Sequence, residues 1–179
     1  ARIGSPYAAA KAGVHEAATS PWNTRKPPTE AQQRAGNYAK GRAIWHGLKV
    51  AIENPAHTTR SGTDPDGKAW SNTLFADYGE FSGTRGADGD PVDVFMGPYP
   101  ESKQVWILNQ LNSDRSFDET KVLAGFVDIR HAVDSYRMSY MPGWDRYMAP
   151  IPLSLDQLNW WLRFGDHTRP FSLDLVPPE

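Results

Sequence analysis

The sequence predicts an α+β fold in which a small curled β-sheet or barrel is flanked by helices. Two observations predict it: β-type patterns dominate up to about residue 126, and two segments with helical spacing close the chain. The chain has 179 residues, and a domain of that size buries about 70% of its unfolded surface without a cross-link. We expect one domain over residues 29–179, preceded by a flexible or docking arm.

That arm is expected over residues 1–28, which are rich in Ala, Ser, Thr and Pro. A short helix is expected next, because Thr29 and Gln32 have the spacing of a capping box. Gly36 and Asn37 are typical of the end of such a helix.

Strands are expected where aliphatic residues alternate with other residues, over about residues 48–53 and 92–96. A continuous apolar run at 105–108 is typical of a strand that is covered on both faces. Between these segments, the Pro and Gly of residues 63–67 predict a turn. A further strand would place three residues on one face, namely Glu119, Lys121 and Leu123.

Two helices are expected at the end of the chain. The first begins after Asp128 and ends before Pro142, with apolar and aromatic residues at helical spacing. This stripe consists of Ile129, Val133, Tyr136 and Tyr140, and its spacing favours a core position for Tyr136. Ser154 and Gln157 form a capping box for the second helix, which Gly165 ends. Its buried stripe is expected to be Leu155, Leu158 and Leu162, with Trp160 and Trp161 beside it.

The composition excludes several classes of function. The absence of cysteine rules out a disulfide scaffold, a thiol nucleophile and a zinc site built on thiolates. A formal net charge of −2 gives no general attraction to nucleic acid or to an anionic membrane. No apolar run approaches the ~20 residues that span a bilayer, and no secretory signal pattern is present. We therefore expect neither a nucleic-acid partner nor a membrane.

The most informative segment is residues 86–94, which place Asp88, Asp90 and Asp93 on a Gly/Pro turn that leads into an apolar strand. Clustered carboxylates repel one another unless a positive charge neutralises them. Hard divalent cations prefer carboxylate oxygens, so Mg²⁺ or Mn²⁺ suits this segment better than Zn²⁺. A solvated acidic turn explains the same residue types equally well at this point.

Further charged residues favour a metal–phosphate site over a solvated turn. In such a site carboxylates hold metals, metals bridge phosphate oxygens, and cations neutralise the remaining charge. For each cation taken alone, a solvated surface charge is the simpler interpretation. The acids are Glu53, Asp114, Asp118 and Glu119, and the cations are Arg60, Lys68, Arg85 and Lys121.

An ordered set of motifs runs through the chain. The central one is Asp88-Gly-Asp90-Pro-Val-Asp93-Val, and Tyr78-Gly79 stands just before it. The others are residues 28–32, 35–38, 52–55, 60–68, 86–90, 117–119 and 125–126. The set resembles the soluble Mg²⁺-dependent inorganic pyrophosphatases of the barrel type, whose small barrel is OB-like. It resembles most the pyrophosphatase-like domain of phage and prophage proteins, including the long polyvalent ones.

The resemblance implies a role for each matching residue. The metal pair that binds the nucleophilic water would be held by Asp88, Asp93 and Glu119. Additional metals would be held by Asp114 and Glu53, and the general base would be Asp90. Phosphate oxygens would be bound by Arg60, Tyr78 and Lys121. The reaction implied is attack of metal-activated water on pyrophosphate, or a related phosphoanhydride.

Some positions depart from the family pattern. No second phosphate-binding arginine is found, and Lys68 or Arg85 would substitute for it. Glu119 stands where the enzymes have Asp, so that neighbouring Asp118 is an alternative ligand. Glu80 follows Tyr78-Gly79 where an aromatic residue is usual, and Tyr136-Arg137 is the counterpart of a Tyr-Lys pair.

These departures keep a second interpretation open. It is a catalytically weak or inert virion or interaction protein that uses the fold structurally, with the arm over residues 1–28 docking on other phage structural proteins. The expected location is the cytoplasm of a bacterial host or the virion, and a homo-oligomer is left open.

Overall fold

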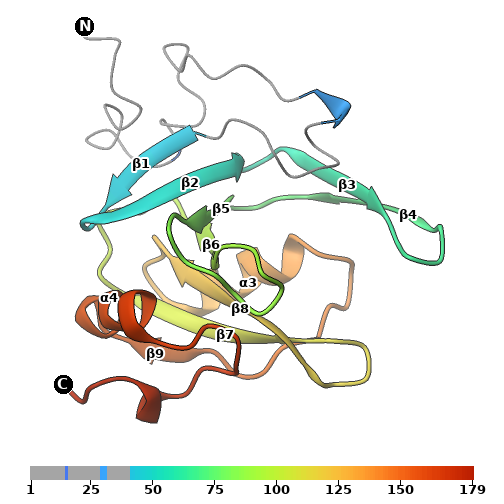
Figure 1. The fold of residues 1–179 in the computed structure, drawn as a ribbon. Coiled ribbons are helices and arrows are strands. Elements are labelled where there is room, and N and C mark those ends of the chain that lie inside the picture. The colour runs from blue at the N-terminus through green and yellow to red at the C-terminus, as the bar shows by residue number, and fades with distance from the viewer. Residues whose placement is uncertain (1–14, 16–28, 32–40) are drawn as a thin grey trace, which may run out of the picture.

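The computed structural model describes residues 15, 29–31 and 41–179. Its main feature is a seven-stranded sheet with the strand order β1-β2-β5-β6-β8-β7-β9 (Figure 1). The strands are β1 (Gly41–Trp45), β2 (Leu48–Asn54), β5 (Asp77–Phe81), β6 (Asp93–Met96), β7 (Val105–Leu111), β8 (Phe117–Ala124) and β9 (Ile151–Leu153). No helix in this part of the chain is long and apolar enough to cross a membrane.

The sheet is antiparallel except at its centre, where β6 and β8 run parallel with Asp93 opposite Lys121. Its outer strands are β1 and β9, and no hydrogen-bonded ladder joins these two edges in the described residues. The predicted α+β class is thus confirmed. The sheet is curled, and the strand pairing of the described residues does not close it into a barrel.

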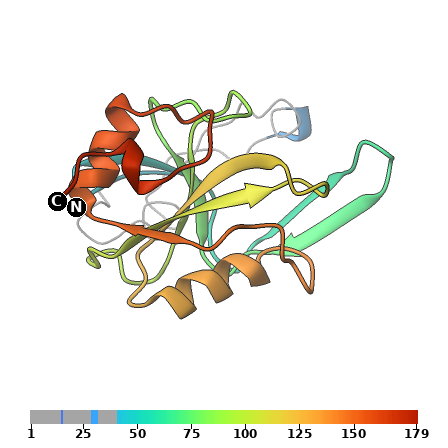
Figure 2. The ribbon, with the colours of Figure 1, turned by 90° about the horizontal axis from the view of Figure 1, so that it is seen from below.

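One helix covers each face of the sheet, as Figure 2 shows. Helix α4 (Leu155–Phe164) packs through Trp161 against the aliphatic face that includes Val94 and Ile107. Helix α3 (Ile129–Met138) packs through Tyr136 against the opposite face. Every residue of β7 is buried, which confirms that the apolar run at 105–108 belongs to a strand covered on both sides.

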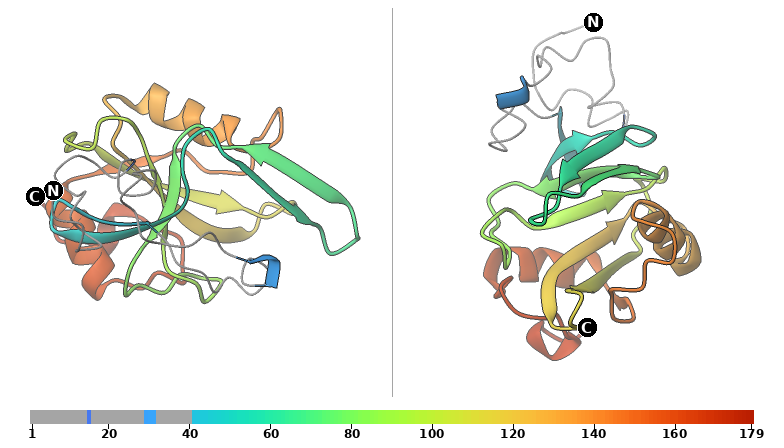
Figure 3. Two further views of the ribbon diagram at one scale, coloured as in Figure 1. Left: turned by 90° about the horizontal axis from the view of Figure 1, so that it is seen from above. Right: turned by 90° about the vertical axis from the view of Figure 1, so that its right-hand side faces the viewer.

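A second, two-stranded sheet stands out from the body of the molecule (Figures 1 and 3). It is the hairpin of β3 (Thr59–Thr63) and β4 (Ala69–Thr73), whose residues alternate between exposed and half-buried. Its turn is the predicted one: the Asp64 amide donates to the Lys68 carbonyl over 2.8 Å, and Gly67 has a φ of +85°.

The two predicted helices are present with their predicted caps. Asp128 caps α3 and Ser154 caps α4 in a full capping box, while Gly165 follows the end of α4. In the expected stripe of α4, Leu158 and Leu162 are buried and Leu155 is half-buried; of the two tryptophans beside it, Trp161 is buried and Trp160 is 36% exposed.

The expected stripe of the first helix needs a correction at both ends. Ile129 is 45% exposed, because it stands at the first helical position and burial on this helix begins at Ala132. Tyr140 follows the Ser139 cap and lies beyond the helix, so its helical spacing to Tyr136 is not maintained by a continuous helix.

The arm and the helix expected after Thr29 lie outside the described residues, apart from residues 15 and 29–31. Glu30 and Ala31 are helical. The Nδ1 atom of His15 lies 2.6 Å from an oxygen of the buried Asp77 carboxylate, to which the Ala56 amide donates over 2.8 Å.

Replacing Asp128 by Ala is expected to lower the free energy of unfolding by about 1 kcal/mol, because the His131 amide then loses its acceptor. The change is measured by urea unfolding. Asp134→Ala removes an exposed carboxylate from the same helix and is expected to change stability by less than about 0.5 kcal/mol. Equal losses in both variants would show that the cap contributes nothing specific.

Candidate active site

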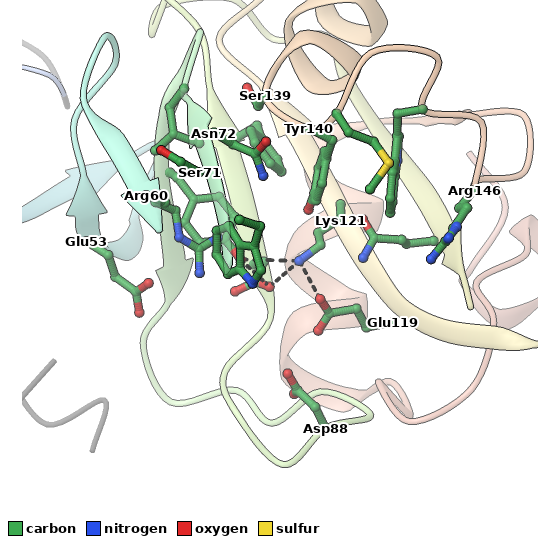
Figure 4. A pocket seen from close by; sticks show the side chains of 18 of the residues that line it. Glu53, Arg60, Ser71, Asn72, Asp88, Glu119, Lys121, Ser139, Tyr140 and Arg146 are labelled. Carbon is green, nitrogen blue, oxygen red and sulfur yellow. Dashed lines mark hydrogen bonds and ion pairs between the residues drawn. The ribbon is translucent and has the colours of Figure 1, made fainter. Parts of the chain in front are cut away.

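An open cavity of about 1170 Å³ lies where the hairpin, the central strands and the segment after α3 meet (Figure 4). Most of the residues predicted to act together line it. These are Glu53, Asp88, Asp90, Asp93 and Glu119 among the acids, and Arg60, Tyr78, Lys68 and Lys121 among the residues predicted to bind phosphate. Two further acids, Asp64 and Glu80, also line the cavity.

The parallel pairing of β6 with β8 places the central charges. Asp93 lies opposite Lys121 across this pair, and Glu119 precedes Lys121 by two residues on the same strand face. The Lys121 ammonium donates to the Asp93 carboxylate over 2.6 Å and also to the Glu119 carboxylate. Tyr78 contacts the same ammonium from β5, so side chains of β5, β6 and β8 meet at Lys121.

Tyr78 completes this group. Its hydroxyl donates to the Asp93 carboxylate over 2.8 Å and accepts from the Lys121 ammonium over 3.2 Å. The Arg60 guanidinium lies 4.5 Å from the centre of the Tyr78 ring, in a cation–π contact that fixes it at the cavity wall. Two cations thus flank one phenol that cannot ionise easily, since burial raises its pKa well above 10.

Burial and charge act against each other on this group. Burial by itself would lower the pKa of Lys121, but the Asp93 carboxylate and its other neighbours raise it well above 10.5, so the ammonium stays charged. Burial raises the pKa of Glu119 to about 7, with Lys121 opposing the shift and Asp93 adding to it. One buried ammonium therefore serves two carboxylates.

The loop between β5 and β6 presents the remaining acids of the predicted signature. It turns tightly at Gly89, which has a φ of +88°, and the Asp90 amide donates to Asp88 over 3.0 Å. In Figure 4 the Asp88 carboxylate faces the cavity below Glu119. Asp90 lines the cavity, and no hydrogen bond to its carboxylate is found in the described residues.

The structure does not bring every predicted residue to the cavity. Asp114 lies exposed in the turn after β7, where its carboxylate accepts from the Ser116 amide over 3.0 Å. Arg85 does not line the cavity, whereas Lys68 does. Of the two alternative ligands, Glu119 lines the cavity and Asp118 instead accepts from Gln110 over 3.1 Å.

The carboxylates that line the cavity are the type of ligand that a hard divalent cation prefers. Carboxylates from β2, β6, β8 and the β5–β6 loop line one cavity, and carboxylate oxygens are the ligands that Mg²⁺ prefers. Within the described residues, no three His, Asp or Glu side chains are close enough together to hold a metal as they stand. The Lys121 ammonium occupies the space between two of the acids, so metal binding requires these side chains to rearrange.

Sequence reasoning missed the aromatic side of the cavity. Trp70, Tyr140, Trp144 and Arg146 all line it. Tyr136, expected in the core, is indeed fully buried and donates to Gln110 over 2.6 Å. Its neighbour Arg137 is exposed and outside the cavity, so the Tyr and Arg that this part of the chain supplies are Tyr140 and Arg146, from the segment after α3. The signal available in the sequence was the density of aromatic residues over 140–147.

Replacing Lys121 by Met is expected to lower the free energy of unfolding of the metal-free protein by about 3–5 kcal/mol, because two partly buried carboxylates lose their shared cation. Urea unfolding in EDTA measures the change. Arg115→Met breaks an exposed pair with Asp145 and is expected to cost less than about 1 kcal/mol. A loss in Lys121→Met no larger than in Arg115→Met would contradict the central role of the ammonium.

Comparison with known proteins identifies the family to which the chain belongs. No curated protein matches the sequence significantly. Among solved structures, an inorganic phosphatase from Anaplasma phagocytophilum matches with 19% identity over 60% of this chain and 67% of its own, at a TM-score of 0.25. At that TM-score the likeness supports no residue-by-residue comparison. The family model of inorganic pyrophosphatase matches residues 30–163, about three quarters of the sequence, and the chain therefore belongs to the inorganic pyrophosphatase family.

Proposed function

We propose that the protein hydrolyses inorganic pyrophosphate, or a related phosphoanhydride, in a Mg²⁺-dependent reaction that uses a metal-activated water. The observation that carries the proposal is the gathering of carboxylates and cations in one cavity: Asp88, Asp90, Asp93 and Glu119 face Arg60 and Lys121. Membership of the inorganic pyrophosphatase family supports it. The phage context, with the host cytoplasm or the virion as location, rests on the resemblance of the motifs alone.

The cations of the cavity are assigned to the phosphate groups. Arg60 is held against the Tyr78 ring, and Lys121 stays protonated in its buried position, so both present a fixed positive charge. Lys68, at the end of the hairpin turn, adds a third charge and takes the place of a second arginine. Such charges stabilise the negative charge that develops on the leaving phosphate.

The acids are assigned to the metals and to proton transfer. Asp88, Asp93, Glu119 and Glu53 would hold Mg²⁺, which lowers the pKa of a bound water and neutralises phosphate charge. Asp90 is assigned as the general base, because it lines the cavity and its carboxylate is not engaged as a hydrogen-bond acceptor in the described residues. Asp114 is assigned to its turn and not to a metal, because Ser116 engages it outside the cavity.

Phosphate release from pyrophosphate with millimolar Mg²⁺ tests the proposal. Asp90→Asn is expected to keep the fold and to lower kcat by about 100-fold or more, the contribution of a positioned general base. Asp145→Asn changes an exposed aspartate outside the cavity and is expected to leave kcat unchanged. Near-parental turnover of the Asp90→Asn protein would remove Asp90 as the base.

A second candidate function is a catalytically inert structural or interaction protein that retains the fold. The observation that favours it is the Lys121 ammonium, which fills the space between Asp93 and Glu119. Absence of phosphate release from well-folded protein, with Mg²⁺ or Mn²⁺ supplied, would favour this second candidate.

A further inference from the structure

The inner face of the β3–β4 hairpin carries side chains that the proposed phosphate chemistry does not use. Two cross-strand pairs make up this face: Arg60 opposite Asn72, and Gly62 opposite Trp70. All four residues are half-buried, while their neighbours in both strands are exposed. Arg60, Trp70 and Asn72 line the cavity, so this face of the hairpin is a wall of the site.

Trp70 lies over a glycine that makes room for it. A Cβ atom at Gly62 would come within 2.6 Å of Cζ2 of the Trp70 ring, so the indole packs directly on the backbone of β3. Neither a second aromatic ring nor a hydrogen-bond partner meets this indole in the part of the chain that is described, and Trp70 belongs to neither core cluster. The half-buried indole of Trp70 is therefore part of the cavity wall.

Asn72 stands beside this indole with an amide that makes no hydrogen bond to the described residues. A side-chain amide offers both a donor and an acceptor, which is what the edge of a nucleobase requires. Tyr140 and Trp144, which also line the cavity, stack with ring centres 4.5 Å apart, and Arg146 lies 5.4 Å from the centre of the Trp144 ring. The cavity therefore has an aromatic and amide lining next to its charged centre.

Pyrophosphate alone does not account for this lining. It consists of two phosphate groups, which have no apolar face to stack and leave most of a cavity of about 1170 Å³ unfilled. Cavities of roughly 300–1000 Å³ already enclose drug-sized ligands. A half-buried indole and an amide that is unpaired within the described residues fit a ligand that joins a flat, polar-edged ring to a phosphoanhydride.

We propose that the cavity takes a nucleoside di- or triphosphate, with the base stacked on Trp70, its edge bonded to Asn72, and the phosphates at Arg60 and Lys121. This inference rests on the proposed hydrolysis and names its substrate class. In the reaction, a water oxygen bonds to the terminal phosphorus and the bond from that phosphorus to the bridging oxygen breaks. The bridging oxygen leaves with the electron pair on the shortened nucleoside phosphate, and the water proton passes to Asp90.

The test compares a substrate that has a base with substrates that have none. Phosphate release is measured from ADP, from pyrophosphate and from tripolyphosphate, all with Mg²⁺. Trp70→Leu is expected to lower the ratio of kcat/KM for ADP to kcat/KM for pyrophosphate by about tenfold or more, the usual size of a base–aromatic stacking contact. Trp70→Phe keeps a flat ring and is expected to keep most of the ratio. Trp160→Leu, on α4 and outside the cavity, is the control and is expected to leave it unchanged.

The Trp70→Leu and Trp70→Phe variants also distinguish recognition of the base by Trp70 from a role of Trp70 in supporting the hairpin. If Trp70 only braces β3 against β4, the bulk of Leu serves nearly as well and the ratio for ADP stays unchanged. That result, or no phosphate release from ADP while pyrophosphate is turned over, overturns the inference and leaves the proposed hydrolysis standing.

A binding experiment keeps the two proposals distinguishable. Calorimetry with the Asp90→Asn protein, Mg²⁺ and ADP measures ADP binding without turnover and so reports on the proposed base contact with Trp70, here called the ring site. Adding Trp70→Leu to the Asp90→Asn protein is expected to weaken ADP binding about tenfold. If no substrate is hydrolysed, the hydrolysis fails, and this measurement alone decides the ring site: weakened binding supports it, while equal binding or none overturns it.

Discussion

One buried ammonium determines how the centre of this protein is arranged. Lys121 bonds to Asp93 on β6, to Glu119 on its own strand β8 and to Tyr78 on β5. It is 2% exposed, so its charge needs opposite charge close by, which the two carboxylates supply. A shift of one residue between β6 and β8 would turn Lys121 to the opposite face of the sheet, so the parallel register is tied to this charge balance.

The rest of the fold holds that register. Strands β6, β8 and β7 are apolar on both faces over residues 94–96, 122–124 and 105–108, and α3 and α4 cover those faces with separate clusters of side chains. The charged face of β8 therefore begins where the apolar covering ends, at the cavity. The end of α3 is joined to the hairpin side of the site, because the Ser139 hydroxyl accepts from the Phe75 amide over 3.1 Å.

Local signals in the sequence predicted much of this structure and part of its site. The alternation at residues 48–53, the turn at 63–67 and the caps at Asp128 and Ser154 depend on neighbours in sequence, and all four are observed. The placement of Asp114 depends on which way a turn faces, and its carboxylate is engaged by Ser116 outside the cavity. Trp70 and Arg146 are brought to the same cavity only by tertiary packing, which no spacing in the sequence reveals.

The hairpin of β3 and β4 also bears on how such a protein can diverge. Its residues belong to neither core cluster, its outer face is exposed, and only its half-buried positions face the cavity. Asp93 and Glu119 of the sheet, by contrast, are bound to Lys121. Under the proposed function, selectivity and chemistry are encoded at separate positions, so that descendants can acquire new ligand preferences by exchanging Gly62, Trp70 and Asn72 while inheriting Arg60 and the charged centre intact.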